Sequence, residues 1–276
     1  MNSRIEAMAQ QLTAVRGVRA VALGGSRARG SHRPDSDWDL GVYYRGSVDT
    51  GALASLAAEV TGRPVEVAGP GGWGPWVNGG AWLSVDDMRV DWILRDLDRV
   101  QRVWADCRAG RYESGVQPGH PLGFWSPAYA GEVALCRVLA DTEGELAALR
   151  VETQQYPEAL RRALIDAAWE ADFSVAAARK SAGSGDVLHV SLCLSRAFGV
   201  LVQSVHADAG VWCLNEKGAL TTATALRAAP EGFAARVAAA LRKLDAGAVE
   251  AAGELVGEVG RHWADAHAPV CPEPAR

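Results

Sequence analysis

The sequence lacks the features of several protein classes. Its five cysteines (Cys107, Cys136, Cys193, Cys213 and Cys271) are an odd number without Cys-x-x-Cys spacing, which argues against a secreted disulfide framework and against a zinc site. No uninterrupted apolar run is long enough to span a bilayer, and the first twelve residues lack the basic and apolar segments of a signal peptide. We therefore expect a folded protein of the cytoplasm.

An excess of positive charge is also missing. The net charge is −5 and the isoelectric point is about 5.7, so the chain has no general attraction to the phosphates of DNA or RNA. The hydrophobic content of 49 % and the charged content of 22 % are typical of a globular protein. Its 276 residues allow one large or two medium domains. We expect neither a long nucleic acid nor a membrane as a partner.

Short apolar and β-branched segments, separated by glycine, proline and aspartate, indicate strands and turns in the first half of the chain. Strands are predicted at Val18–Leu23, Asp37–Tyr44, Pro64–Val67, Ala81–Val85 and Met88–Leu94. Helices are predicted at Ser3–Arg16, Thr50–Val60 and Asp96–Arg108. The linker of Asp86 and Asp87 is short enough for an antiparallel hairpin between the last two strands.

From about Pro127 the composition changes to alanine, leucine, arginine and glutamate, and apolar residues recur at helical spacing. A segment rich in glycine and serine at residues 181–185 predicts a break between two long helices. The expected fold class is therefore α+β. An N-terminal mixed β-sheet domain with helices is predicted for residues 1–115, and a C-terminal α-helical bundle for residues 118–276.

Two aspartates at the start of the second predicted strand indicate a metal site. Asp37 and Asp39 are two residues apart, so their side chains point to the same face of the strand. Two such charges repel each other unless a cation lies between them. Carboxylate oxygens suit Mg²⁺, which commonly binds one or two carboxylates together with substrate phosphates.

The turn Gly24-Gly25-Ser26 after the first predicted strand has the character of an anion site. Glycines allow a ligand to approach the backbone, and the N–H groups of a strand-to-helix turn, with the Ser26 hydroxyl, can donate to phosphate. A nucleoside triphosphate bound with Mg²⁺ would satisfy these donors and the carboxylates together. The chemistry indicated is nucleotidyl transfer by in-line displacement.

The arrangement of Gly25-Ser26, ten intervening residues and Asp37-x-Asp39 resembles the motif of the DNA polymerase β-like nucleotidyltransferase superfamily. Within it the chain looks most like the small bacterial branch of aminoglycoside and lincosamide nucleotidyltransferases. The resemblance implies a palm-like nucleotidyltransferase domain, then a helical domain that binds the acceptor. It also implies a third carboxylate on a neighbouring strand, for which Asp91 is preferred because an unpaired charge in an apolar strand is costly.

The resemblance assigns roles to the individual residues. The catalytic and metal-binding carboxylates would be Asp37, Asp39 and Asp91, and the nucleotide-binding residues would be Gly25, Ser26, Arg27 and Lys217, the last within Asn215-Glu216-Lys217. The general base stays open among Asp91, Glu113, Glu132 and Glu170.

The expected activity is Mg²⁺-dependent transfer of a nucleoside monophosphate, AMP from ATP, to a hydroxyl group of a small molecule, with release of pyrophosphate. An aminoglycoside- or lincosamide-type antibiotic is the acceptor that the resemblance implies, and it also leaves a homodimer open. Two alternatives stay open: an AMP transferase of the toxin–antitoxin type that modifies a protein, and a nucleotide-binding module without turnover.

Three tryptophans lie among glycines just before the strand that leads to Asp91, in residues 71–82. Trp73 and Trp76 could present their aromatic faces to a ligand, or they could fill the edge of the core. For Trp82, which lies on the predicted strand itself, the core position is favoured.

Overall fold

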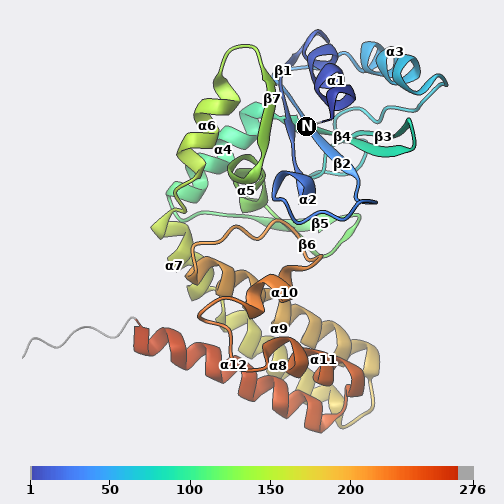
Figure 1. The fold of residues 1–276 in the computed structure, drawn as a ribbon. Helices are drawn as coiled ribbons and strands as arrows, with labels where there is room; N and C mark the ends of the chain where they lie inside the picture. The colour runs from blue at the N-terminus through green and yellow to red at the C-terminus, as the bar shows by residue number, and fades with distance from the viewer. Residues whose placement is uncertain (1, 267–276) are drawn as a thin grey trace, which may run out of the picture. The chain divides into compact units, whose positions relative to one another are not determined.

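The computed structural model describes residues 2–266, and the chain divides into two compact units, Met1–Tyr156 and Pro157–Arg276 (Figure 1). The strands of the first unit are β1 (Val18–Leu23), β2 (Trp38–Tyr44), β3 (Gly80–Val85), β4 (Met88–Asp96), β5 (Ser114–Gln117), β6 (His120–Trp125) and β7 (Arg137–Asp141). Its helices are α1 (Ser3–Thr13), α2 (Gly25–Ala28), α3 (Thr50–Thr61), α4 (Leu97–Arg108), α5 (Pro127–Leu135) and α6 (Glu145–Thr153). The predicted α+β class, with a mixed sheet and a helical C-terminal region, is confirmed.

The main sheet has the strand order β3-β4-β2-β1-β7. Only its β2 and β4 pair in parallel, and the other neighbours are antiparallel, so the sheet is mixed. The predicted hairpin is present between β3 and β4, where Asp86 and Asp87 have φ angles of 47° and 64°. Two consecutive residues with positive φ are the geometry of a type I′ turn, which matches the twist of the flanking strands.

One face of the sheet forms the core under α1 and α3. Leu40 and Val42 of β2 and Trp92 of β4 lie on this face, packed with residues such as Met8 of α1 in one buried cluster. Because side chains alternate along a strand, burial of these residues places Asp39 and Asp91 on the opposite face. The hydrophobic pattern therefore decides to which side of the sheet the carboxylates point.

The opposite face is covered by α5 over the later residues of β2 and β4. Arg95 of β4 is 4 % exposed and forms a bidentate pair with Glu132 of α5, with nitrogen–oxygen distances of 2.6 and 2.7 Å. Tyr43, which pairs with Arg95 in the parallel ladder, is also buried. Asp39 and Asp91, four residues earlier on each strand, stay partly exposed.

The two units meet in sequence at Tyr156 and Pro157, about 40 residues after the expected boundary at 115–118. The reason is β7, which pairs with β1 as an edge strand of the main sheet and keeps α5 and α6 in the first unit. The expected junction at 115–118 instead lies in the β5–β6 hairpin. The strand predicted at Pro64–Val67 is wrong; only Ala68 forms an isolated bridge, with Gly80.

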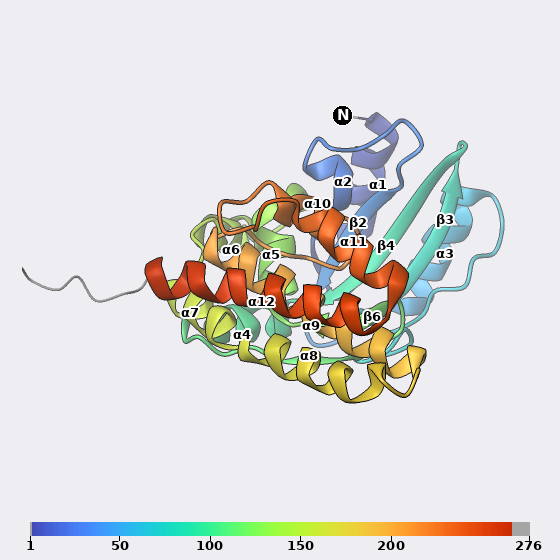
Figure 2. The same cartoon turned by 90° about the horizontal axis from the view of Figure 1, so that it is seen from below.

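The second unit is built from helices (Figure 2). They are α7 (Glu158–Asp166), α8 (Trp169–Ala182), α9 (Val187–Asp208), α10 (Ala219–Thr224), α11 (Phe233–Lys243) and α12 (Ala246–Ala266). The predicted break between two long helices lies between α8 and α9. Among the described helices, α9 alone has the length and mean hydropathy (1.4) of a membrane span, and 44 % of its most apolar window is buried inside the protein.

The four cysteines in the described part of the chain are free thiols, namely Cys107, Cys136, Cys193 and Cys213. Cys271 lies outside the described residues. Burial raises the pKa of the Cys107 thiol to about 12, so this side chain acts as a small apolar group of the core.

We expect the Glu132→Ala substitution to lower the free energy of unfolding by about 3–5 kcal/mol, because it leaves the buried Arg95 guanidinium without its carboxylate. Urea unfolding measures the change. Glu113→Ala, at an exposed site, is the control and should change stability by less than about 0.5 kcal/mol. The double variant Arg95→Met/Glu132→Leu should recover most of the loss, and a single-variant cost below about 1 kcal/mol would contradict the prediction.

Candidate functional site

The centre of the candidate site is a pair of carboxylates on the two parallel strands. Asp39 of β2 and Asp91 of β4 are direct partners in the ladder, so their side chains lie on one face of adjacent strands. Burial, together with the nearby Asp39 and Asp37 carboxylates, raises the pKa of Asp91 to about 6, while Arg89 acts in the opposite direction. Like charges held this close favour either a shared proton or a bound cation.

The glycine turn is in contact with Asp39 of this pair. The Gly24 N–H donates to the Asp39 carbonyl oxygen at 2.7 Å, which ties the end of β1 to the start of β2. Gly25 has a φ of 60°, and a Cβ atom there would overlap the Oδ2 atom of Asp39. Only glycine fits this position, because it accepts a positive φ and leaves room for the carboxylate. The turn and the carboxylates predicted from sequence therefore form one site.

Arg27 is placed differently from the sequence expectation. Its guanidinium donates to the carbonyl oxygens of Pro34, Ser36 and Asp37 at 2.6–3.2 Å and lies over the Trp38 ring at 4.2 Å. These donors are occupied by the loop that leads into β2. In this structure Arg27 positions the backbone of Asp37, and direct contact with phosphate stays a prediction.

Sequence reasoning missed Arg89. Its Nε atom lies 2.6 Å from Oδ1 of Asp37, and it also donates to the Asp35 carbonyl oxygen at 2.6 Å. Arg89 is two residues before Asp91 on β4, so it lies on the carboxylate face one position earlier. Strand alternation was the signal that could have found it, because any residue two positions from Asp91 faces the same way.

The candidate general bases differ in their surroundings. The Glu132 carboxylate is committed to Arg95, and that of Glu170 to Arg196 in the second unit at 2.6 and 2.9 Å. Glu113 is exposed, and its backbone pairs with Ser126 in the β5–β6 region. Of the four candidates, Asp91 is the one that the structure places beside Asp39.

Lys217 belongs to the second unit, in the segment before α10. Its backbone N–H donates to the Asn215 side chain at 3.0 Å, so the Asn-Glu-Lys segment forms a local Asx turn. The predicted contact between Lys217 and a triphosphate stays a prediction.

Of the three tryptophans before β4, Trp73 and Trp82 stack on each other, and Trp76 has a different environment. Trp76 is buried, stacks on Phe124 of β6 and has the Arg99 guanidinium over its ring, so it belongs to the core. Trp82 was expected to fill the core edge, and this expectation is wrong: its side chain is 68 % exposed. The physical reason is the alternation of β3, which gives the buried face to Ala81 and Leu83.

A divalent metal fits the donors of this site. Asp39 and Asp91 offer only oxygen ligands, and their mutual repulsion is what a cation would relieve. Among the described residues no group of three or more histidine, cysteine or acidic side chains is close enough to hold a metal alone. Mg²⁺ often keeps waters and substrate phosphates as further ligands, so two carboxylates suffice for it.

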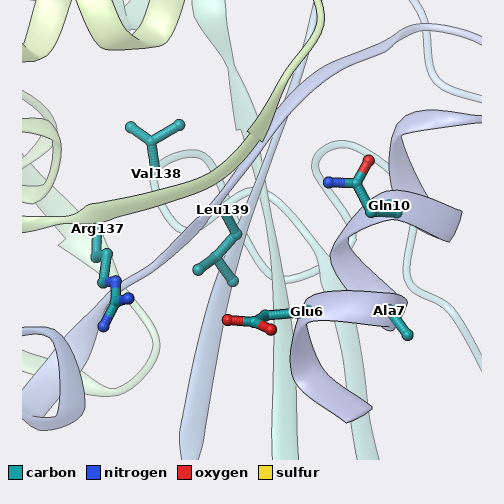
Figure 3. Close-up of a pocket in the computed structure, with 6 residues that line it drawn as sticks. All are labelled: Glu6, Ala7, Gln10, Arg137, Val138 and Leu139. Atoms are coloured by element: carbon teal, nitrogen blue, oxygen red, sulfur yellow. The ribbon is translucent and has the colours of Figure 1, made fainter. Parts of the chain in front are cut away.

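A separate cavity of about 350 Å³ lies between α1 and β7 (Figure 3). It is lined by Glu6, Ala7, Gln10, Arg137, Val138 and Leu139. Helix α1 packs on the face of the sheet opposite the carboxylates, and β7 is the edge strand beyond β1. This cavity is therefore not part of the site.

Comparison with known proteins identifies the first part of the chain. Residues 5–70 match the family model of the nucleotidyltransferase domain, a segment that includes the glycine turn, Asp37 and Asp39 but not Asp91. A nucleotidyltransferase-like protein from Exiguobacterium sibiricum has a similar structure, with 12 % identity, a TM-score of 0.45, and coverage of 94 % of this chain and 75 % of that one. No curated protein matches the chain. Over residues 5–70 the family match confirms the resemblance to the DNA polymerase β-like nucleotidyltransferases, and the aminoglycoside and lincosamide branch stays a prediction.

We expect Gly25→Ala to disturb the site more than Gly30→Ala. Both glycines have positive φ, at 60° and 72°, so both substitutions should cost about 1–2 kcal/mol in backbone strain. Only at position 25 would the new methyl group also overlap Asp39, since nothing lies within 4 Å of a Cβ at position 30. Urea unfolding and Mg²⁺ titration measure the difference, and equal behaviour of the two variants would contradict the contact.

The Asp91 carboxylate should make stability fall as pH rises. Because its pKa in the folded state, about 6, exceeds the unfolded value, the native state binds more protons between about pH 4 and 6, and stability declines across that range. Asp91→Asn should therefore gain stability over wild type at pH 7 but not at pH 4, by of the order of 1–2 kcal/mol after allowance for partial exposure. Urea unfolding at both pH values, with Asp87→Asn as the control, checks this; a gain independent of pH would contradict it.

Proposed function

We propose that the chain, through the nucleotidyltransferase domain in residues 5–70, transfers a nucleoside monophosphate from a nucleoside triphosphate to a hydroxyl group of a small molecule. The observation that carries the proposal is the contact of the Gly24-Gly25-Ser26 turn with Asp39, which lies in register with Asp91 on the neighbouring strand. A phosphate-binding turn and a pair of carboxylates are the two parts that this chemistry requires, and here the turn adjoins one carboxylate of the pair.

The turn is suited to the triphosphate. The first N–H groups of α2 have no partner within the helix, and the Ser26 hydroxyl adds a further donor beside them. Asp39 and Asp91 would hold Mg²⁺, which when bound supplies positive charge between the carboxylates and the phosphate oxygens. Arg27 and Arg89 keep the Asp35–Asp37 loop in place beside the pair.

The reaction exchanges a phosphoanhydride bond of the triphosphate for a phosphoester bond to the acceptor. The acceptor oxygen forms a bond to the α-phosphorus, the bond from that phosphorus to the bridging oxygen of the β-phosphate breaks, and pyrophosphate leaves with the electron pair. The hydroxyl proton passes to a carboxylate, for which Asp91 is placed best because it lies on the side of Asp39 away from the glycine turn.

ATP is the donor, AMP is the group transferred, and a small molecule of the aminoglycoside or lincosamide type is the acceptor. The support is the resemblance of the sequence motif to the small bacterial branch, together with a second compact unit of 120 residues beyond the nucleotidyltransferase domain. An enzyme that modifies a protein needs no such unit to enclose its acceptor. Modification of a co-purified protein in place of any small molecule would contradict this part of the proposal.

The test is pyrophosphate release from ATP, GTP or CTP with Mg²⁺ and a panel of aminoglycosides and lincosamides. Asp39→Ala should lower the rate by of the order of 10²–10³-fold, since it removes several kcal/mol of charge stabilisation. Ser26→Ala should raise KM for ATP about tenfold through the loss of one charge-assisted hydrogen bond. Asp87→Ala, in the hairpin turn, is the matched control, and an Asp39→Ala variant that is folded and fully active would falsify the site.

A further inference from the structure

Trp82 is a large apolar side chain that faces solvent from within the main sheet. Its neighbours on β3, Ala81 and Leu83, are 1 % and 4 % exposed, whereas Trp82 is 68 % exposed. Its ring stacks on that of Trp73 at a centroid distance of 4.3 Å and an interplanar angle of 14°. In these two rings, called here the indole pair, Trp73 covers one face of Trp82, and the exposed apolar part of Trp82 is a feature that often marks a binding site.

The indole pair is held rigidly from behind. The Trp73 N–H donates to the Asn78 carbonyl oxygen at 3.1 Å, and the Gln117 side chain donates to the Trp73 carbonyl oxygen at 2.6 Å. Gly80 has a φ of 148°, and a Cβ there would overlap the Trp92 carbonyl oxygen and lie 3.0 Å from the Trp73 ring. A ring surface already fixed in place loses little entropy when a ligand binds.

The indole pair lies next to the reacting carboxylates. Trp82 of β3 is the direct partner of Asp91 on β4, which is in turn the partner of Asp39 on β2. Partners directly opposite each other have Cβ atoms about 4.5–5.5 Å apart. The glycine turn follows β1, on the far side of β2. Across the sheet the order is therefore the glycine turn, Asp39, Asp91 and Trp82.

This order separates the two substrates. In an in-line displacement the attacking hydroxyl and the leaving pyrophosphate lie on opposite sides of the α-phosphorus. If the glycine turn holds the phosphates that leave, the acceptor approaches from the side of Asp91, and the first side chain that it meets there is Trp82.

We propose that Trp82 binds the acceptor, and that its indole face packs against the C–H face of a saccharide ring that carries the attacking hydroxyl group. A sugar ring has an apolar C–H face and carries hydroxyl groups at its edge. The apolar face could pack on the Trp82 indole while a hydroxyl group reaches the Asp91 carboxylate on the neighbouring strand. Trp73 acts through Trp82 as a positioning residue. The inference rests on the transfer proposed above and adds to it a substrate-binding residue and the face of the acceptor that this residue contacts.

The test uses the full chain and isothermal titration calorimetry with three probes: kanamycin A, lincomycin and the non-hydrolysable α,β-methylene-ATP with Mg²⁺. Trp82→Ala should weaken binding of at least one saccharide about tenfold or more and leave the nucleotide within about twofold. Trp82→Phe should retain most of the affinity, and Trp73→Ala should have a smaller effect. Trp169→Ala is the matched control, because this tryptophan of α8 is 66 % exposed and lies in the other unit.

Two results would overturn the inference. Loss of nucleotide binding in Trp82→Ala, with the saccharides unaffected, would assign the indole pair to the nucleobase. Saccharide binding that is absent in wild type, or unchanged in Trp82→Ala, would remove the acceptor role. Failure of the transfer reaction can be told apart from failure of the role of Trp82. Saccharide binding through Trp82 without any pyrophosphate release would overturn the proposed activity alone. Pyrophosphate release with an unchanged acceptor KM in Trp82→Ala would overturn the role of Trp82 alone.

Discussion

The parallel pairing of β2 with β4 is the constraint on which the rest of the site depends. It places Asp39 and Asp91 directly opposite each other, at a separation where two carboxylates cannot both ionise without cost. The backbone ladder and the packing under α1 and α3 hold this arrangement against the repulsion. The close approach of the two carboxylates is unfavourable on its own, and it is maintained by the core on the other side of the same strands. Because a bound cation would relieve the repulsion between the carboxylates, the arrangement favours cation binding.

The two faces of the sheet have different roles in holding the carboxylates in place. On one face Leu40, Val42 and Trp92 supply the buried area, and on the other face α5 closes over Tyr43 and Arg95. The Arg95–Glu132 pair ends the covered part of that face four residues beyond the carboxylates. The position of α5 therefore determines which residues of β2 and β4 are accessible on this face. Asp39 and Asp91 lie in the accessible part.

The sequence predicted the elements whose signals are local. Strand alternation and the turn residues gave β1, β2 and the β3–β4 hairpin, all present in the structure. Asp37 and Asp39 were expected on one face of a strand, but β2 begins at Trp38, so Asp37 lies before it. Edge strand β7 was not predicted, because its five residues are too few to show a clear alternation of apolar and polar side chains. Its pairing partner β1 is also more than 100 residues earlier in the chain. The second unit therefore begins at Pro157, later than the change in composition suggested.

Arginines were the hardest residues to place from sequence. A guanidinium has several donors and a long side chain, so its partner depends on tertiary structure more than on spacing. Arg27 donates to the carbonyl oxygens of the loop before β2, which spacing did not indicate, while its contact with phosphate stays a prediction; Arg89 was overlooked although it pairs with Asp37.

Both arginines act on the same few residues, Pro34 to Asp37, where the chain has no regular secondary structure to hold it. Asp39 lies within the ladder, but Asp37 lies before it, so its position depends on these side chains. Binding of a cation beside Asp37 would compete with Arg89, which is already paired with that carboxylate. The three carboxylates are therefore not equivalent. The sheet fixes the backbone of Asp39 and Asp91, whereas the position of Asp37 depends on the side chains that contact its loop.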